Sequence, residues 1–406
     1  MARVVRNPLA GPLGRLGPLA GPDGGPSSGS SSSSGAADFH RKLPGYRATP
    51  LVPAPGLAAR FGVGHVLVKD ESNRYGLPAF KMLGASWAAY CLLIERLGVE
   101  PSWVTVEDLA AAFAPLRPLE LVTATDGNHG RAVARVARLF GLDARVFVAE
   151  GTAPVRIAAI ESEGATVEEV AGDYDAAVAR SAEVAAAAGV RALLVSDTSW
   201  EGYVDGPRRV IEGYDTIFRE VDGAIAGAGL PAPDVVVIPV GVGALAAAAV
   251  AHYRVGSAGP RLVAVEPEDA DCVLRSVLAG ERTTVPGPHR SMMVGLNCGT
   301  PSLVAWPLMR AGLDWCVTVE DERAAEAMRW LAAEGIVSGE TGAAAAAGLG
   351  AFIESGLAGL GPGSTVLVLS TEGATDEAHY RDIVGREASD VAMAGPGKGA
   401  TDAPYV

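Results

Sequence analysis

The chain has 406 residues, of which 49% are hydrophobic and 20% charged, and its formal net charge is −14 at pH 7. This composition excludes a disordered or fibrous protein, and the excess of acidic residues argues against nucleic acid or an anionic membrane as a partner. The length predicts two domains. The four cysteines have no CxxC spacing, so we expect reduced thiols in a cytoplasmic protein and no metal site.

The two ends of the chain have a loose composition. Residues 1–37 are dominated by Gly, Pro and Ser, which predicts a disordered tail, and their apolar residues are too interrupted for a signal peptide. We expect a second loose tail over residues 387–406. The longest uncharged run, residues 235–251, contains Pro239, Gly241 and Gly243, which favours a strand, a turn and a helix over a membrane span.

Between the tails, short β-branched runs alternate with Ala-rich stretches of helical length, a pattern typical of βαβ units around a parallel sheet. Small molecules bind such sheets beyond the carboxyl ends of the strands, so the segments that follow the strands are the candidates for a binding site. Strands are predicted at His65–Lys69, Leu121–Thr123, Arg145–Ala149, Thr166–Val170, Ala192–Ser196, Val235–Val240, Arg261–Glu266, Trp315–Val319 and Thr365–Ser370.

The first candidate is Lys81, which precedes a helix expected from Met82. Between Phe80 and an apolar helical turn the amine is partly desolvated, which lowers its pKa and suits it to react with an aldehyde. A solvated surface lysine is the common alternative for a lysine at the start of a helix.

The second candidate is the turn Ala124-Thr-Asp-Gly-Asn-His-Gly130, between a strand and a helix. The N–H groups at the helix start could bind a carboxylate, and Asn128 offers an amide to a phenolic oxygen. Asp126 would repel a carboxylate, so its presence indicates a cationic ligand or proton transfer. The alternative is an Asx-turn with an N-cap and no further role.

Three more segments follow predicted strands. Asp197 places a second acid on the same rim, although a helix N-cap would use the same residue type. The turn Gly241-Val-Gly-Ala-Leu245 precedes an Ala-rich helix and can hold a phosphate through backbone N–H groups, or can be a plain tight turn. It lacks the dinucleotide and triphosphate fingerprints. Ser370 and Thr371 end a strand with hydroxyls that could meet a pyridine nitrogen.

Taken in order, these segments resemble the fold type II, or β-family, pyridoxal-phosphate enzymes, which include threonine dehydratase and cystathionine β-synthase. Within them the chain resembles the diaminopropionate ammonia-lyases over residues 38–386. The matching stretches are Phe39-His-Arg-Lys-Leu-Pro-Gly-Tyr46, Val68-Lys-Asp-Glu-Ser72, Ala79-Phe-Lys81, Ala124-Thr-Asp-Gly-Asn-His-Gly130, Asp197-Thr-Ser-Trp-Glu-Gly-Tyr203, Ser338-Gly-Glu-Thr-Gly342 and Ser370-Thr-Glu-Gly-Ala-Thr-Asp376.

The resemblance implies a tryptophan synthase β-like α/β fold of two domains, each with a mostly parallel sheet flanked by helices. The larger domain, residues 38–81 and 206–386, would bind the cofactor, and the smaller, residues 82–205, would face the substrate. Lys81 would hold pyridoxal 5'-phosphate covalently. Its other contacts would come from Asn128 at the phenolic oxygen, Ser370 or Thr371 at the pyridine nitrogen, Glu340 near the ring, and Gly241, Val242, Gly243, Ala244 and Leu245 at the phosphate.

The implied reaction is α,β-elimination of 2,3-diaminopropionate to pyruvate and two molecules of ammonia, in a homodimer. Lys81 would take the α-proton, and Asp126 and Asp197 would serve substrate recognition and proton transfer. Asp126 on the opposite face would also allow the D-isomer to react. Two alternatives stay open: β-elimination or β-replacement on serine, threonine or an unusual biosynthetic amino acid, and a non-catalytic amino-acid sensor.

Two residues beside Lys81 depart from the family pattern. Pro78 stands where Asn is common, and Ala85 where Gly is common, which leaves the substrate preference open. Cys272 and Cys298 lie in segments that also look family-like and could approach each other. A bridge between them is possible, but a reducing cytoplasm favours free thiols.

Overall fold

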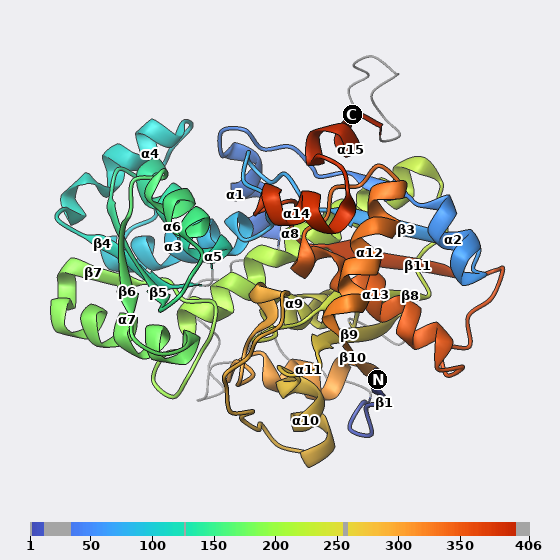
Figure 1. Ribbon diagram of the computed structural model, residues 1–406. Helices are drawn as coiled ribbons and strands as arrows, with labels where there is room; N and C mark the ends of the chain where they lie inside the picture. The colour runs from blue at the N-terminus through green and yellow to red at the C-terminus, as the bar shows by residue number, and fades with distance from the viewer. Residues whose placement is uncertain (1, 12–33, 126, 255–258, 395–406) are drawn as a thin grey trace.

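The computed structural model describes residues 2–11, 34–125, 127–254 and 259–394, and their strands form two sheets (Figure 1). The seven-stranded sheet has the order β1-β10-β9-β8-β11-β3-β2, and the four-stranded sheet has the order β6-β5-β4-β7. The strands are β1 (Val4–Arg6), β2 (Leu51–Pro53), β3 (His65–Asp70), β4 (Glu120–Ala124), β5 (Asp143–Ala149), β6 (Thr166–Val170), β7 (Ala192–Leu194), β8 (Val235–Pro239), β9 (Arg261–Pro267), β10 (Trp315–Val319) and β11 (Thr365–Ser370).

The strand pairs are parallel except where the edge strands β1 and β2 join β10 and β3. The predicted α/β class with two mostly parallel sheets is thus confirmed. The helices are α1 (Ser34–Lys42), α2 (Pro55–Phe61), α3 (Met82–Leu97), α4 (Val106–Phe113), α5 (Asn128–Leu139), α6 (Pro154–Glu161), α7 (Tyr174–Ala188), α8 (Asp205–Ala228), α9 (Ala244–Tyr253), α10 (Cys272–Ala279), α11 (Trp306–Gly312), α12 (Asp321–Ala333), α13 (Glu340–Glu354), α14 (Glu377–Val384) and α15 (Ala388–Ala394), with short 3-10 turns at Ala114–Leu116, Gly189–Arg191 and Val294–Leu296.

The large sheet is buried on both faces, which explains its continuous apolar strands. Side chains alternate along a strand, so Val235 and Val237 pack in the cluster with α12 and α13, whereas Val236 and Ile238 pack in the cluster with α8 and α9. Helices α3 to α7 surround the four-stranded sheet instead (Figure 1). Segments that follow the carboxyl ends of strands from both sheets line one pocket.

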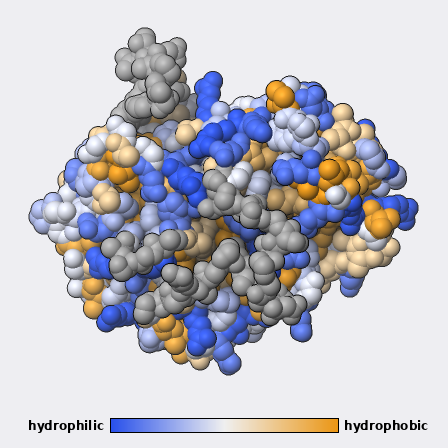
Figure 2. All heavy atoms as spheres, turned by 180° about the vertical axis from the view of Figure 1, so that it is seen from behind, coloured by the Kyte–Doolittle hydropathy of each residue, from blue (hydrophilic) through white to orange (hydrophobic). Residues whose placement is uncertain are grey.

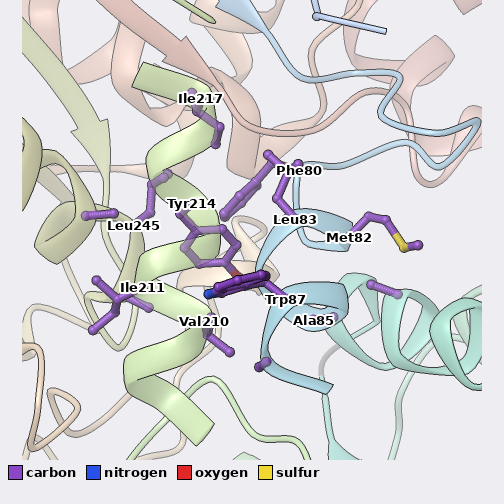
Figure 3. Close-up of a cluster of buried hydrophobic side chains, with 14 of the residues drawn as sticks. Phe80, Met82, Leu83, Ala85, Trp87, Val210, Ile211, Tyr214, Ile217 and Leu245 are labelled. Carbon is purple, nitrogen blue, oxygen red and sulfur yellow. The ribbon is translucent and has the colours of Figure 1, made fainter. Parts of the chain in front are cut away.

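Close packing of α3 on α8 fixes the segment that carries Lys81. A Cβ on Gly84 would lie 2.6 Å from Cε1 of Tyr214, and a Cβ on Gly213 would lie 2.5 Å from the carbonyl oxygen of Leu83. Figure 3 shows Tyr214 on α8 turned toward the side chains at the start of α3. Because glycine lets the two helices approach, the first turn of α3 is held against α8.

All nine predicted strands are present, within a few residues at their ends. The predicted tails are wrong in part. β1 pairs with β10 inside the range predicted as disordered, α1 begins at Ser34, and α15 forms in the predicted C-terminal tail. Hydrogen bonding to an existing sheet edge orders β1 despite its Gly- and Pro-rich surroundings. The remaining tail residues, 12–33 and 395–406, lie outside the described residues.

The surface is mixed in polarity. On the face turned away from the view of Figure 1, hydrophobic and hydrophilic residues are interspersed (Figure 2). Exposed large hydrophobic residues such as Val104, Val190 and Met393 are far apart in the sequence. Within the described ranges, no helix combines the length and the apolar character that crossing a membrane requires.

Candidate active site

A pocket lies where segments after β3, β4, β7, β8 and β11 meet, as the strand pattern predicted. Residues from both sheets line it, so neither sheet alone provides the site. The lining consists of Phe80, Lys81, Thr125, Gly127, Asn128, His129, Arg156, Tyr174, Asp197, Tyr214, Pro239, Val240, Gly241, Val242, Gly243, Ala244, Leu245, Gly295, Leu296, Cys298, Thr341, Thr371 and Glu372.

Lys81 immediately precedes α3 and lines this pocket, and its side chain is 22% exposed to solvent. Its Nζ donates a hydrogen bond to Oδ2 of Asp197 at 2.5 Å. Burial acts to lower the pKa of Lys81, but the Asp197 carboxylate outweighs it, so the pKa is raised above its ordinary value. The prediction of a lowered pKa for Lys81 is therefore wrong, because the sequence did not reveal the contact with Asp197.

Asp197 and His129 complete a buried polar group around the amine. Burial acts to raise the pKa of Asp197, but the nearby Lys81 ammonium outweighs burial and holds this pKa well below its usual range. Burial lowers the pKa of His129, and its Nε2 lies 2.8 Å from the carbonyl oxygen of Val195. A carbonyl only accepts, so Nε2 carries the proton and Nδ1, 3.9 Å from Oδ2 of Asp197, is left as an acceptor.

The turn after β8 forms a cradle of backbone groups. Gly243 has φ +98°, and a Cβ there would lie 2.3 Å from Cε of Met309. A Cβ on Gly241 would lie 2.9 Å from Sγ of Cys298. Helix α9 begins at Ala244 without a side-chain cap and without an acidic residue in its first turn. Its N–H groups and dipole are thus available to an anion.

The turn after β4 is held by a hydroxyl. Oγ1 of Thr125 accepts from the backbone N–H of Gly127 at 2.8 Å and of Gly130 at 2.9 Å. Asn128, the first residue of α5, takes no part in these turn hydrogen bonds. Its Nδ2 instead donates to Oε2 of Glu372. The Asx-turn alternative therefore does not explain Asn128, while Asp126 lies outside the described residues.

The two hydroxyls after β11 differ. Ser370 is buried outside the pocket lining, where its Oγ bonds Oγ of Ser338 at 2.8 Å. Oγ1 of Thr371 is buried in the lining and has no hydrogen-bond partner among the described residues. Glu340 is also absent from the lining and pairs with Nδ1 of His379 at 2.6 Å. Of the three, Thr371 is placed to meet a ligand.

The residues present fit pyridoxal phosphate. The amine of Lys81 can react with its aldehyde, the glycine cradle suits its phosphate, and the unpartnered Thr371 hydroxyl suits its pyridine nitrogen. Among the described residues, no cluster of three or more His, Cys, Asp and Glu could hold a metal ion.

Comparison with known proteins agrees with this fit. The family model for pyridoxal-phosphate dependent enzymes matches residues 42–372. The chain belongs to the pyridoxal-phosphate dependent enzymes. Within this family, the diaminopropionate ammonia-lyase of Escherichia coli (strain K12) is 37% identical over 365 residues, 86% of this chain and 90% of the relative.

Solved structures place this pyridoxal-phosphate enzyme in fold type II. The selenomethionine-labelled holo diaminopropionate ammonia-lyase from Escherichia coli has a TM-score of 0.84 at 33% identity and covers 95% of this chain and 96% of its own. The same enzyme in complex with an aminoacrylate-PLP azomethine reaction intermediate has a TM-score of 0.82 at 33% identity, with 95% and 97% covered.

Sequence reasoning missed several residues around this cofactor site. Glu372 stood inside a quoted stretch, two residues beyond a strand end, so its position was a usable signal. Arg156, Tyr174 and Tyr214 belong to helices without a motif and reach the pocket only through tertiary packing. Oη of Tyr174, for example, lies 3.5 Å from Oδ1 of Asp197.

The four cysteines of the enzyme are buried free thiols. Sγ of Cys272 lies 3.9 Å from the carbonyl oxygen of Gly241, and Cys298 approaches the same residue. Burial raises the pKa of Cys272 well above its ordinary value, which keeps the thiol protonated. The structure thus has the two thiols near one turn without a bond between them.

Proposed function

We propose that the protein eliminates ammonia from 2,3-diaminopropionate to give pyruvate and a second ammonia. The observation that carries the proposal is the Lys81–Asp197 ion pair inside the pocket of a chain 37% identical to a diaminopropionate ammonia-lyase. A lysine for the α-proton beside an acid for a substrate ammonium suits a diamino acid. The capture of an aminoacrylate by the Escherichia coli enzyme supports an elimination.

The proposed cofactor contacts follow the pocket. Lys81 attaches the aldehyde, the turn from Gly241 to Leu245 binds the phosphate, and Thr371 meets the pyridine nitrogen. Asn128 donates to the phenolic oxygen. Ser370 and Glu340 lie outside the pocket lining, where they bond Ser338 and His379, so we assign them no direct contact with the cofactor. When bound, the cofactor withdraws electrons from the α-carbon of the substrate.

The protein groups then move protons. Once the substrate occupies the pocket and Lys81 Nζ is neutral, this amine removes the α-proton. The Asp197 carboxylate, released from the lysine ammonium, holds the β-ammonium of the substrate. Asp126 is proposed to bind the same ammonium or to take the α-proton of the D-isomer. Phe80 and Tyr214, whose rings lie 4.7 Å apart, keep water from the lysine side.

A pyruvate assay tests this proposal. Purified holoenzyme is incubated with D- and L-2,3-diaminopropionate, and pyruvate is followed by coupled reduction with lactate dehydrogenase. We expect pyruvate from at least one isomer. Absence of product from both isomers rejects the proposal. Pyruvate from serine or 2-oxobutyrate from threonine, without turnover of the diamino acid, would favour the hydroxy amino acid alternative.

Three further assignments are proposals of the same kind. We propose the domain division at residues 81/82 and 205/206, since all four strands of the smaller sheet lie between these points. The four free thiols support a cytoplasmic location. A homodimer rests on the family resemblance, and sedimentation velocity would test it.

A further inference from the structure

Glu372 follows β11 and lies where three parts of the site meet. Only 3% of the residue is exposed, and it lines the pocket. Its Oε1 accepts from the backbone N–H of Thr341 at the start of α13, at 3.1 Å, and its Oε2 accepts from Nδ2 of Asn128. Its backbone forms a β-bridge with Ala79, two residues before Lys81. The carboxylate thus links the end of β11 in the seven-stranded sheet to the start of α5, which packs on the four-stranded sheet.

Both partners of the Glu372 side chain are N–H donors, so the carboxylate acts as an acceptor in each bond. Burial raises the pKa of this carboxyl and the nearby Glu340 adds to the rise, while Arg156 and hydrogen bonds from Thr341 and Asn128 oppose it. A buried carboxylate is costly unless it is paired in this way. The two bonds therefore hold Glu372 and its partners in one arrangement.

This contact decides how the amide of Asn128 is turned. An amide has a donor nitrogen and an acceptor oxygen, and only the nitrogen can bond an ionised carboxylate. Nδ2 carries two N–H bonds, of which Glu372 takes one. The other stays available to a second acceptor in the pocket. Without the Glu372 carboxylate, the Asn128 amide could turn over, so that its oxygen, instead of its second N–H, faces the pocket and repels an anionic oxygen.

We propose that Glu372 is a positioning residue that turns the Asn128 amide so that its second N–H serves the phenolic oxygen of the cofactor. The proposal rests on the cofactor contact proposed for Asn128 and is independent of which amino acid is the substrate. An N–H donor stabilises the ionised phenolic oxygen. If the Asn128 N–H no longer points at this oxygen, the pH at which the bound cofactor changes its absorption should therefore rise.

The test compares Glu372→Gln, Asn128→Ala and the double variant as reconstituted holoenzymes, by visible spectra between pH 6 and 10 and by cofactor titration. Glutamine keeps the shape but offers the amide an N–H as well as an oxygen. We expect Glu372→Gln to raise the spectral midpoint by about one pH unit and to weaken cofactor binding on the order of tenfold. In the Asn128→Ala background, the same change should have no further effect.

Glu266→Gln is the matched control. Glu266 is also a buried glutamate whose side chain accepts from the start of a helix, at 2.7 Å from Val273 N and 2.8 Å from Leu274 N, and burial raises its pKa to about 8, but it does not line the pocket. Its variant should leave the midpoint unchanged. If Glu372→Gln does not fold, Glu372→Asp, which keeps a shortened acceptor, should give a smaller shift that also depends on Asn128.

Each remaining outcome overturns the proposal in a different way. An unchanged spectrum in Asn128→Ala removes the cofactor contact of Asn128 and, with it, the role of Glu372. A normal midpoint in Glu372→Gln, with a shifted midpoint in Asn128→Ala, removes the role of Glu372 alone. Equal shifts from Glu372→Gln with and without Asn128 would mean that the carboxylate acts by another route.

Discussion

Lys69 and Lys81 are close in sequence, and both are enclosed by the fold, yet their surroundings differ. Lys69, at the end of β3, is 1% exposed and donates to the carbonyl oxygen of Thr49 at 2.7 Å and to Oε2 of Glu220 at 2.6 Å. Burial lowers its pKa, against the opposing effect of nearby carboxylates. Lys81 faces the pocket, and the Asp197 carboxylate raises its pKa.

The comparison shows that a lowered pKa does not identify the reactive amine. Lys69 belongs to a closed network in which Arg74 also bonds Glu71 and Glu220, so its amine has no open side. Lys81 has one carboxylate partner that a substrate ammonium can replace. Access to a cavity and an exchangeable partner therefore distinguish the lysine that we propose attaches the cofactor, and the first three of four experiments test this distinction.

The largest effect is expected for Lys81→Ala. This change removes the proposed attachment point of the cofactor and the proposed base for the α-proton, so kcat/KM should fall by at least ~10³-fold. In the parent enzyme, borohydride reduction followed by peptide mapping should label Lys81. A label on Lys69 instead would reverse the assignment of the two lysines.

Lys69→Met should act on stability. It leaves Glu220 and Glu71 with Arg74 as their remaining cationic partner in a buried network, and breaking such a network costs about 3–5 kcal/mol of the free energy of unfolding. Urea unfolding measures the loss. The exposed Lys42→Met is the control, and a loss within about 0.5 kcal/mol for both variants would contradict the network.

Asp197→Asn should change how cofactor attachment depends on pH. The raised pKa keeps Lys81 protonated at neutral pH, so attachment to the parent enzyme should accelerate as the pH rises. Without the carboxylate, burial is the largest remaining effect and lowers the pKa of Lys81, so attachment should become fast at a pH about one unit or more lower. Stopped-flow absorbance measures the rate, with Asp215→Asn, outside the pocket, as the control. An unchanged pH profile in Asp197→Asn would contradict the ion pair.

The smallest effect concerns a third enclosed cation. Burial acts to lower the pKa of His252, but hydrogen bonds with Asp215 and Asp222 outweigh it and raise the pKa to about 9. A raised pKa stabilises the fold below the unfolded value of about 6.5, and this stability is lost as the pH rises to about 9.

His252→Gln should therefore reduce the free energy of unfolding at pH 6 on the order of 1 kcal/mol, since Asp222 is exposed to solvent. At pH 9.5 the difference from the parent should be much smaller. Exposed His65→Gln should show no such dependence, and a constant difference across this range would rule out the ion pairs of His252.

The central strands and the rim of the site were predictable because both depend on local sequence. β-branched runs marked the nine strands β3 to β11, and Lys81, Asn128 and Asp197 follow three of them into one pocket. Strands β1 and β2 escaped notice because each is only three residues long and stands beside prolines, whereas the equally short β7 belongs to a longer apolar run. The raised pKa of Lys81 could not be predicted from the sequence either, since it depends on the Asp197 carboxylate, 116 residues away in the sequence.

The short strand β1 has a practical consequence for handling the protein. Val4 and Val5 pair with Val317 and Cys316, and Arg3 bonds Thr318, so the first residues cover one edge of the large sheet. A version shortened to begin at α1 would expose the N–H and C=O groups of β10 to solvent. Such a bare edge recruits strands from other molecules, so the shortened protein should aggregate more readily during purification.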